Sequence, residues 1–349
     1  MAYALHARNG TFYTYRGRQV DAPARGAQDI DLSAYDLYPG LVNAHDHLEL
    51  NHYPRTKYQE RYNNAHQWGD EVNERLNDEP FVTLQRYSLW DRCFIGGLKN
   101  LLSGVTTVAH HGPLHNPLIS TWFPIRVLQT FGWAHSLHFE TEIQIHTSYT
   151  ATPPDNPWFI HLAEGTDDVA AGEYKRLNEL GCIGPNTVIV HGVGLRANDL
   201  DHAKDHIRGI VRCPTTNHYL LGRTLNDWPD GLTVGLGSDS RLTADGDFLS
   251  EPGATDPTFQ NANRKILGIE TERHADFYAA AAPPRHRTDI ALVMVSGQPV
   301  WGANTVIERF KHVQTISGDL DGHPIALAKR LARQISRCKI DEPGLRLDR

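Results

Sequence analysis

The chain has 349 residues, of which 40% are hydrophobic and 21% are charged, the composition of an ordinary globular protein. Its formal net charge of -7 provides no basic surface for a phosphate backbone, so we expect no nucleic-acid partner. No apolar run approaches the roughly 20 residues that a membrane span needs. The first residues lack the basic start and apolar core of a secretory signal, so we expect a cytoplasmic protein without a membrane partner. The four cysteines form no CxxC pair, which favours reduced thiols over disulfides or a cysteine-rich zinc module.

Residues 1–38 contain short alternating segments interrupted by Gly and Pro, a pattern typical of small antiparallel strands. From Leu41 onward, short apolar runs alternate with stretches of helical periodicity, which indicates βαβ units with buried parallel strands. The strand-like runs are residues 104–109, 187–190, 210–213 and 233–236, and the helical stretches are about 71–103, 117–130, 166–180 and 197–207.

This alternation predicts an α/β fold, a (β/α)8-type TIM barrel over residues 39–285. Strand texture returns near 289–302 and an amphipathic stretch spans 324–340, so residues 286–349 should add strands and a terminal helix. With residues 1–38, they are expected to form a small β-sandwich-like domain. Residues 111–157 have room for only one clear helix where a regular barrel needs two more βα units, so the barrel should be abbreviated or distorted there.

Two histidines end the first expected barrel strand. The stretch Pro39-Gly-Leu-Val-Asn-Ala-His45-Asp-His47 places His45 and His47 at alternate positions, so both side chains face the same way and could share one metal ion. With 20 histidines in the chain, this motif alone could equally be a pair of ordinary turn residues.

Three later strand ends carry residues of matching chemistry. Trp158-Phe-Ile-His161-Leu-Ala-Glu164 offers a third imidazole and a carboxylic acid able to move protons. Val188-Ile-Val-His191 ends in another histidine, which alone could be a core residue. Asp239 follows the run Val234-Gly-Leu-Gly-Ser238; it could bind a metal or cap a helix. Because the active sites of such barrels lie at the carboxyl ends of the strands, the four ends together favour a hydrolytic site.

The ordered motifs PGLVNAHDH, GVTTV, HLAE, VHG, CPTTN and GSD resemble the amidohydrolase superfamily, over roughly residues 38–250. The resemblance is closest to the mononuclear deaminase-like branch, which includes cytosine, guanine and S-adenosylhomocysteine deaminases and the triazine hydrolases. It implies one divalent metal, zinc or iron, a small-molecule substrate and a homodimer.

The resemblance also implies a role for each site residue. The metal ligands would be His45, His47, His161 and Asp239, and the catalytic residues would be Glu164, His191 and Asp239. Related binuclear enzymes use a bridging lysine from a middle strand, but the chain has no lysine between Lys99 and Lys175. A bridging Glu140 or Glu142 stays open. Substrate contacts are expected from four further residues at the same rim, His110, His111, Asn217 and Arg241.

These roles predict hydrolysis of a C–N bond, namely deamination of an aminated heterocycle or amidine-like molecule by hydroxide, which a bound metal makes available at neutral pH. Glu164 would deliver a proton to the leaving group. The alternatives are hydrolysis of a cyclic amide at the same site, or a binding protein that kept the barrel without turnover. Two other catalytic classes are excluded, because the chain has neither a PCxxC motif after His47-Leu-Glu49 nor a GxSxG elbow.

Overall fold

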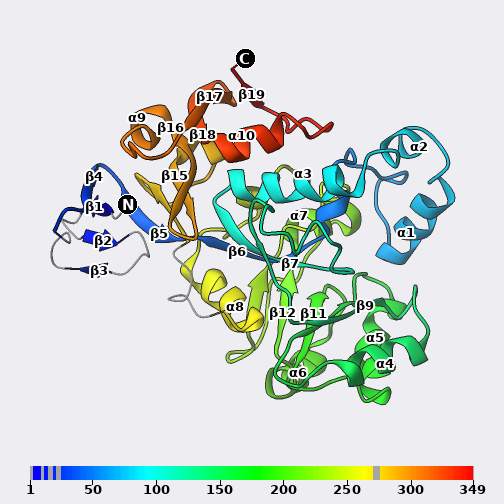
Figure 1. Cartoon of the computed structure of the whole chain (residues 1–349). Coiled ribbons are helices and arrows are strands. Elements are labelled where there is room, and N and C mark those ends of the chain that lie inside the picture. The colour runs from blue at the N-terminus through cyan, green and yellow to red at the C-terminus, as the bar shows by residue number, and fades with distance from the viewer. Residues whose placement is uncertain (1–2, 9–11, 15–18, 21–24, 270–275, 349) are drawn as a thin grey trace.

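The computed structural model describes residues 3–8, 12–14, 19–20, 25–269 and 276–348 (Figure 1). Parts of the expected N-terminal strand region, residues 1–2, 9–11, 15–18 and 21–24, lie outside the described residues. Among the helices of the described part, none has the length and apolarity needed to cross a bilayer.

Parallel strands form the centre of the molecule, in a three-stranded sheet β6-β7-β8 and a five-stranded sheet β13-β12-β11-β10-β9. Their residues are apolar and almost continuously buried, as expected for strands covered on both faces. The two sheets meet where the Asp239 backbone N–H donates to the His45 carbonyl (3.0 Å). The strands are β6 (Leu41–Asp46), β7 (Val105–His110), β8 (Arg126–Val127), β9 (Gly132–Ser136), β10 (Trp158–Leu162), β11 (Thr187–His191), β12 (Gly209–Arg212) and β13 (Val234–Leu236).

Helices follow most of these strands and cover the outside of the barrel (Figure 1). Two of the expected helices are confirmed almost residue for residue, α5 (Asp168–Glu179) and α6 (Ala197–His206). The Asp167 side chain caps α5 by accepting from the Ala170 backbone N–H. The remaining barrel helices are α3 (Leu89–Leu102), α4 (Glu142–Ala151), α7 (Pro214–Leu221) and α8 (Pro257–Leu267), and a 3-10 turn, η2, spans Phe248–Ser250.

The expected shortening between residues 111 and 157 has a simple structural form. Helix α4 is the one helix between β7 and β10, and β8 is separated from β9 by residues 128–131 alone. The predicted helix at 117–130 was wrong. Pro124 cannot continue a helix, and Arg126 and Val127 pair with β7 instead.

The predicted helix at 71–103 is three helices. They are α1 (Ala65–Glu74), α2 (Phe81–Leu84) and α3, with a 3-10 turn η1 (Leu48–Leu50) before them. Asn64 caps α1 and Ser88 caps α3 with their side chains, and these capping residues start new helices at each point. We call residues 48–84 the lid segment; it projects to one side of the barrel ends (Figure 1).

The chain ends form two further sheets. The N-terminal strand β5 pairs antiparallel with β14 in a seven-stranded sheet of order β19-β17-β18-β16-β15-β14-β5, as the expected joining of the chain ends requires. β14 belongs to this sheet although it falls inside the range assigned to the barrel. Its strands are β5 (Asp36–Pro39), β14 (Phe277–Ala280), β15 (Ile290–Val295), β16 (Gln298–Ala303), β17 (Thr315–Leu320), β18 (His323–Ala328) and β19 (Leu345–Leu347).

A four-stranded sheet, β3-β2-β1-β4, packs on the seven-stranded sheet in a sandwich-like arrangement. Leu5 and Ile30 of the smaller sheet share a buried cluster with Leu292 and Met294 of the larger one. The predicted terminal amphipathic stretch 324–340 is partly the strand β18 and partly helix α10. The elements are β1 (Tyr3–Ala7), β2 (Phe12–Thr14), β3 (Gln19–Val20), β4 (Gln28–Leu32), η3 (Arg287–Asp289), α9 (Asn304–Ile307) and α10 (Lys329–Ile335).

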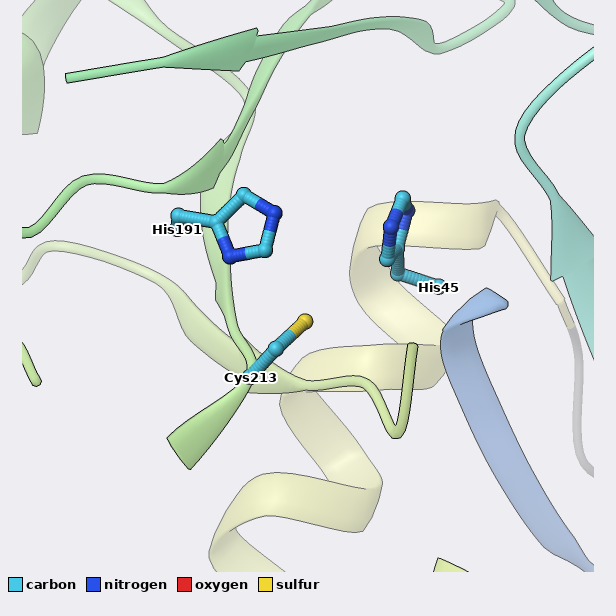
Figure 2. Close-up of side chains that lie close together, drawn as sticks. All are labelled: His45, His191 and Cys213. Atoms are coloured by element: carbon cyan, nitrogen blue, oxygen red, sulfur yellow. The ribbon is translucent and has the colours of Figure 1, made fainter. Parts of the chain in front are cut away.

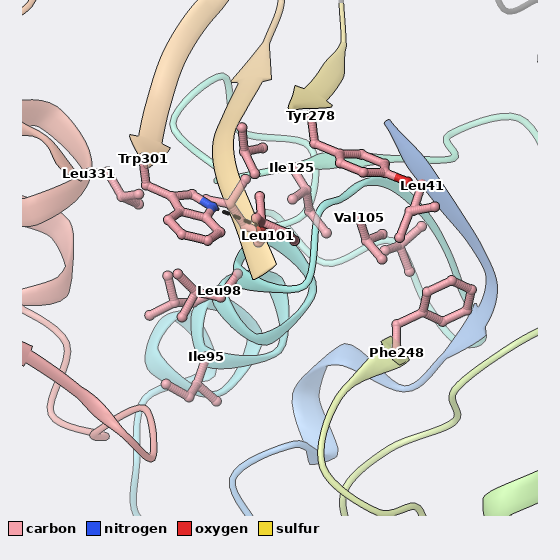
Figure 3. Close-up of a cluster of buried hydrophobic side chains, with 14 of the residues drawn as sticks. Leu41, Ile95, Leu98, Leu101, Val105, Ile125, Phe248, Tyr278, Trp301 and Leu331 are labelled. Atoms are coloured by element: carbon pink, nitrogen blue, oxygen red, sulfur yellow. Dashed lines mark hydrogen bonds between the residues drawn. The ribbon is translucent and has the colours of Figure 1, made fainter. Parts of the chain in front are cut away.

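One large hydrophobic cluster joins the seven-stranded sheet to the first part of the barrel (Figure 3). The Trp301 indole N–H donates to the Leu101 carbonyl (3.1 Å) at the end of α3, and Tyr278 packs in the same cluster as Leu41 and Val105. Each fully buried side chain of this size contributes about 1.5–3 kcal/mol. The cluster therefore fixes the starts of β6 and β7, whose other ends carry histidines.

Candidate active site

The residues singled out at the four strand ends converge in space. His45 lies in β6 and His47 directly follows it, while His161 lies in β10. His191 and Asp239 have positive backbone φ angles of 74° and 56°, a conformation that costs non-glycine residues about 1–3 kcal/mol and is held only by the surrounding structure. Such strain at two strand ends is typical of a functional site.

The four expected metal ligands are close enough to hold one ion. The Nε2 atoms of His47 and His161 are 3.2 Å apart, and the Asp239 carboxylate oxygen Oδ1 lies 3.9 Å from His45 Nε2 and 4.0 Å from His47 Nε2. Two imidazoles bound to zinc at 2.0–2.1 Å in a tetrahedral site would be about 3.3 Å apart. Both ring nitrogens of His45 are buried without a hydrogen-bond partner, and a metal ion would provide a partner for one of them.

His111 is a further potential ligand that the sequence placed among the substrate contacts. Its ring stacks on the His161 ring at a centroid distance of 4.0 Å, and with His45 and His161 it forms a buried triad that could hold a metal ion. Burial holds the pKa of all three histidines well below the ordinary value. The imidazoles are therefore neutral, the form that binds metals.

Backbone carbonyls orient two of these rings. The His161 Nδ1 lies 2.8 Å from the His135 carbonyl, and the His111 Nε2 lies 2.9 Å from the Ala134 carbonyl. Both carbonyls belong to β9, so this strand aims the opposite nitrogen of each ring at the site. Such outer contacts fix the tautomer and the ring orientation of metal-binding histidines.

His191 and Glu164 lie side by side next to the proposed ligands. The Asn217 amide donates to His191 Nδ1 (2.9 Å), and Thr224 Oγ1 donates to the Asn217 carbonyl oxygen (3.1 Å). The His191 proton therefore resides on Nε2, 3.4 Å from Glu164 Oε2. Burial lowers the pKa of His191 to about 4. Burial, then the charges of Asp239 and Glu173, hold the pKa of Glu164 well above its ordinary value.

Cys213 is a site residue that the sequence did not single out for chemistry. It comes directly after β12, and its sulfur points between the rings of His45 and His191 (Figure 2). The three ligand atoms lie within 4.8 Å of one another. Burial raises the pKa of the thiol well above its ordinary value, so the sulfur stays protonated and closes the floor of the site. Its position at a strand end was the available signal.

A buried ionic network connects the backbone and side chains next to the proposed ligands. The Lys99 ammonium lies 2.8 Å from the Asp46 carboxylate and donates to the Asp239 carbonyl oxygen (3.1 Å). The Asn100 amide donates to the same Asp46 carboxylate (2.7 Å). Asp46 stands between His45 and His47, so one lysine ties the first strand end to the last. The sequence pattern gave no signal for Lys99.

Of the four expected substrate contacts, His111 alone lines the central cavity. Asn217 is buried and positions His191 instead. His110 faces the opposite side of β7, where its Nδ1 lies 3.6 Å from Glu49 Oε2. The Arg241 guanidinium donates to both carboxylate oxygens of Glu342 (2.8 and 2.7 Å). His110 and Arg241 therefore do not line the cavity themselves, although Glu49, the neighbour of His110, does.

The cavity above the site has a volume of about 530 Å³. Its inner wall is the polar set His47, His111, His161, Glu164, His191 and Asp239, and its outer wall is the apolar set Leu50, Tyr53, Trp68, Val72, Leu76 and Phe81 of the lid segment.

One contact joins the inner wall to the lid segment. Glu173 of α5 accepts from the Ala163 backbone N–H (2.6 Å) at the end of β10 and lies 3.3 Å from His66 Nε2 of α1. Burial raises the pKa of Glu173 to about 7 and lowers that of His66 to about 4. Both shifts favour the neutral forms of the two side chains, so burial opposes an ion pair between them.

Known proteins resemble this chain in structure but not in sequence. No protein-family model and no curated protein sequence matches the chain. Among solved structures, an adenosine deaminase from Xanthomonas campestris with bound zinc has a TM-score of 0.61 at 14% identity, covering 85% of this chain and 91% of that one. Atrazine chlorohydrolase from Arthrobacter aurescens in complex with zinc has a TM-score of 0.61 at 15% identity, covering 83% and 88%.

Guanine deaminase of E. coli is also similar, with a TM-score of 0.56 at 17% identity, covering 80% of this chain and 87% of that one. The similar structures thus include two deaminases and a chlorohydrolase, and the match extends over most of each chain. The chain therefore shares its fold with these two deaminases and this chlorohydrolase.

Proposed function

We propose that the chain is a zinc-dependent hydrolase that deaminates an aminated heterocycle or an amidine-like small molecule. One observation carries the proposal: four side chains that can bind a metal, of which His45, His161 and Asp239 are buried and His47 is partly buried, converge beside the Glu164 carboxyl group at one cavity. The solved structures of similar fold show that this barrel accommodates deaminases, and two of them contain zinc.

His45, His47, His161 and Asp239 would hold the ion, and their donor set suits it. Neutral imidazole and carboxylate are common zinc ligands. A bound divalent ion lowers the pKa of water to about 7 and so makes hydroxide available at neutral pH.

The protein residues supply the proton transfers. The raised pKa of Glu164 favours its protonated form, which is the form that can donate to the ring nitrogen or leaving amine. The His191 Nε2–H points to the same space and can stabilise negative charge that develops on the substrate. Asp239 can accept the proton from water, because its Oδ1 already receives the Ser240 backbone N–H (2.7 Å) and is held in place.

The test is ammonia release by the zinc-loaded protein over a panel of aminated pyrimidines, purines and triazines, with cyclic amides added. We expect ammonia from at least one aminated ring. The control is His161→Ala, which should lose both the metal, measured by elemental analysis, and the activity. Ring opening of a cyclic amide without ammonia would replace deamination by amide hydrolysis, and no turnover of any compound would overturn the proposal.

A further inference from the structure

We propose that the substrate carries an apolar substituent and no negative charge, with its ring on the inner wall and its alkyl or aryl group on the outer wall. The inference rests on the proposed function for the identity of the reacting ring. The size and charge of the substituent follow from the outer wall itself.

The lid segment lines the cavity with the six apolar residues of the outer wall and with three polar residues, Glu49, His66 and Asn73. Tyr53, Val72 and Phe81 form a hydrophobic cluster with Leu242 from the barrel, and Trp68 packs against it. The Trp68 indole N–H donates to the Thr56 carbonyl (2.9 Å), so its one polar atom is already used. A substituent entering here contacts carbon atoms, which favours alkyl or aryl groups by about fourfold in affinity for each buried methylene.

The cavity wall offers an anionic substituent no basic side chain. Among the described residues that line the cavity none is Lys or Arg, and four have carboxyl groups, Glu49, Glu164, Glu173 and Asp239. Any carboxylate or phosphate placed on the outer wall would therefore lose its hydration without gaining a partner.

Two cations near the cavity, Arg55 and Lys99, already have partners of their own. The Arg55 guanidinium donates to the Thr243 carbonyl (2.9 Å) and lies 3.7 Å from the Asp245 carboxylate. Lys99 is buried against Asp46. Neither can turn to an anionic substituent without abandoning a partner.

The size of the cavity leaves room beyond one ring. A volume of about 530 Å³ lies in the range of pockets that enclose drug-sized ligands, roughly 300–1,000 Å³. A heterocycle without substituents, bound at the proposed metal site, would not reach the outer wall. An apolar substituent on the ring would cover this wall.

The experiment uses aminopyrimidines that differ in one ring substituent: hydrogen, ethyl, butyl or carboxypropyl. With the zinc-loaded protein, kcat/KM should rise about fourfold for each methylene and should be at least 100-fold lower for carboxypropyl than for butyl. Binding of the matched pyrimidines that lack the amino group is measured by calorimetry and should follow the same order.

The two readouts separate the proposals. If no compound releases ammonia but the butyl analogue binds more tightly than the carboxypropyl analogue, the proposed function fails and the substrate class stands. If the carboxypropyl compound binds or reacts as well as the butyl compound, the substrate class is overturned whatever the reaction.

Two cavity variants and one control variant test whether the substituent lies on the outer wall. Trp68→Ala should flatten the dependence on alkyl length, whereas Trp122→Ala, which removes a 56% exposed tryptophan outside the cavity, should not change it. Asn73 is exposed at the cavity edge, so Asn73→Arg adds a cation without burying it and should raise kcat/KM for the carboxypropyl compound about tenfold. An unchanged alkyl dependence in folded Trp68→Ala would contradict the placement of the substituent.

Discussion

The inner and outer walls of one cavity are built in different ways. The inner wall stands on the ends of buried parallel strands, and the Lys99 network ties its first and last strands together. The outer wall stands on α1, on α2, which has four residues, on the 3-10 turn η1 and on the segments that connect them. Helices this short are not stable by themselves and depend on packing. Their contacts with the barrel, such as that of Phe81 with Leu242, therefore hold the outer wall in place.

This difference indicates that the inner wall determines the reaction and the outer wall determines the choice of substrate. A metal site tolerates little displacement of its ligands, so it needs rigid elements with fixed outer contacts. The choice of substrate can vary with side chains on connecting segments, which tolerate change. We expect inner-wall substitutions to act on the reaction or on folding, and outer-wall substitutions to act on selectivity.

The largest expected effect is at Glu164. Glu164→Gln removes the acidic proton but keeps the shape, so turnover should fall by about 10²–10⁴, the usual contribution of a general acid. The zinc content should be unchanged, since Glu164 is not among the proposed ligands. Steady-state kinetics with metal analysis would check both, and normal turnover would remove Glu164 from the mechanism.

The second effect concerns the support below the inner wall. Lys99→Met leaves the buried Asp46 carboxylate without its cation, which should lower the free energy of unfolding by about 3–5 kcal/mol. Denaturant titration would measure the loss. The double variant Lys99→Met with Asp46→Asn should recover part of it, because no charge is left unpaired. A loss below about 1 kcal/mol in the single variant would mean that the inner wall does not depend on this pair.

The smallest effect concerns the contact between the two walls. The pKa of Glu173 is about 7 when folded, against an ordinary value of 4.5, so folding favours its protonated form. Its contribution to stability is complete below about pH 4.5 and is lost as the pH rises through 7. Glu173→Gln does not titrate, so relative to the natural chain it should gain about 1–3 kcal/mol between these pH values. The free energy of unfolding of both proteins would be measured at several pH values. If it changed with pH in the same way for the variant and the natural chain, the prediction would be contradicted.

The sequence predicted the inner wall better than any other part of the molecule. The four proposed ligands, Glu164 and His191 were expected to lie together because each lies at or after the end of an apolar strand, and the ends of parallel strands meet at one edge. Their chemical roles stay predictions. The helix expected at 117–130 failed because the local pattern did not show that Arg126 and Val127 would pair with β7. The sequence could not predict which of His110 and His111 faces the cavity, because the direction of each side chain depends on how β7 packs against its neighbours.

The order of motifs along the chain determined which residues form the candidate metal site, since strand periodicity is local and barrel topology is regular. Tertiary structure alone decided the rest. It stacked His111 on His161, aimed Cys213 at the floor, buried Lys99 beneath two strand ends, and folded residues 48–84 over the cavity. Each of these depends on contacts between segments far apart in the chain, and side-chain periodicity carries no information about such contacts.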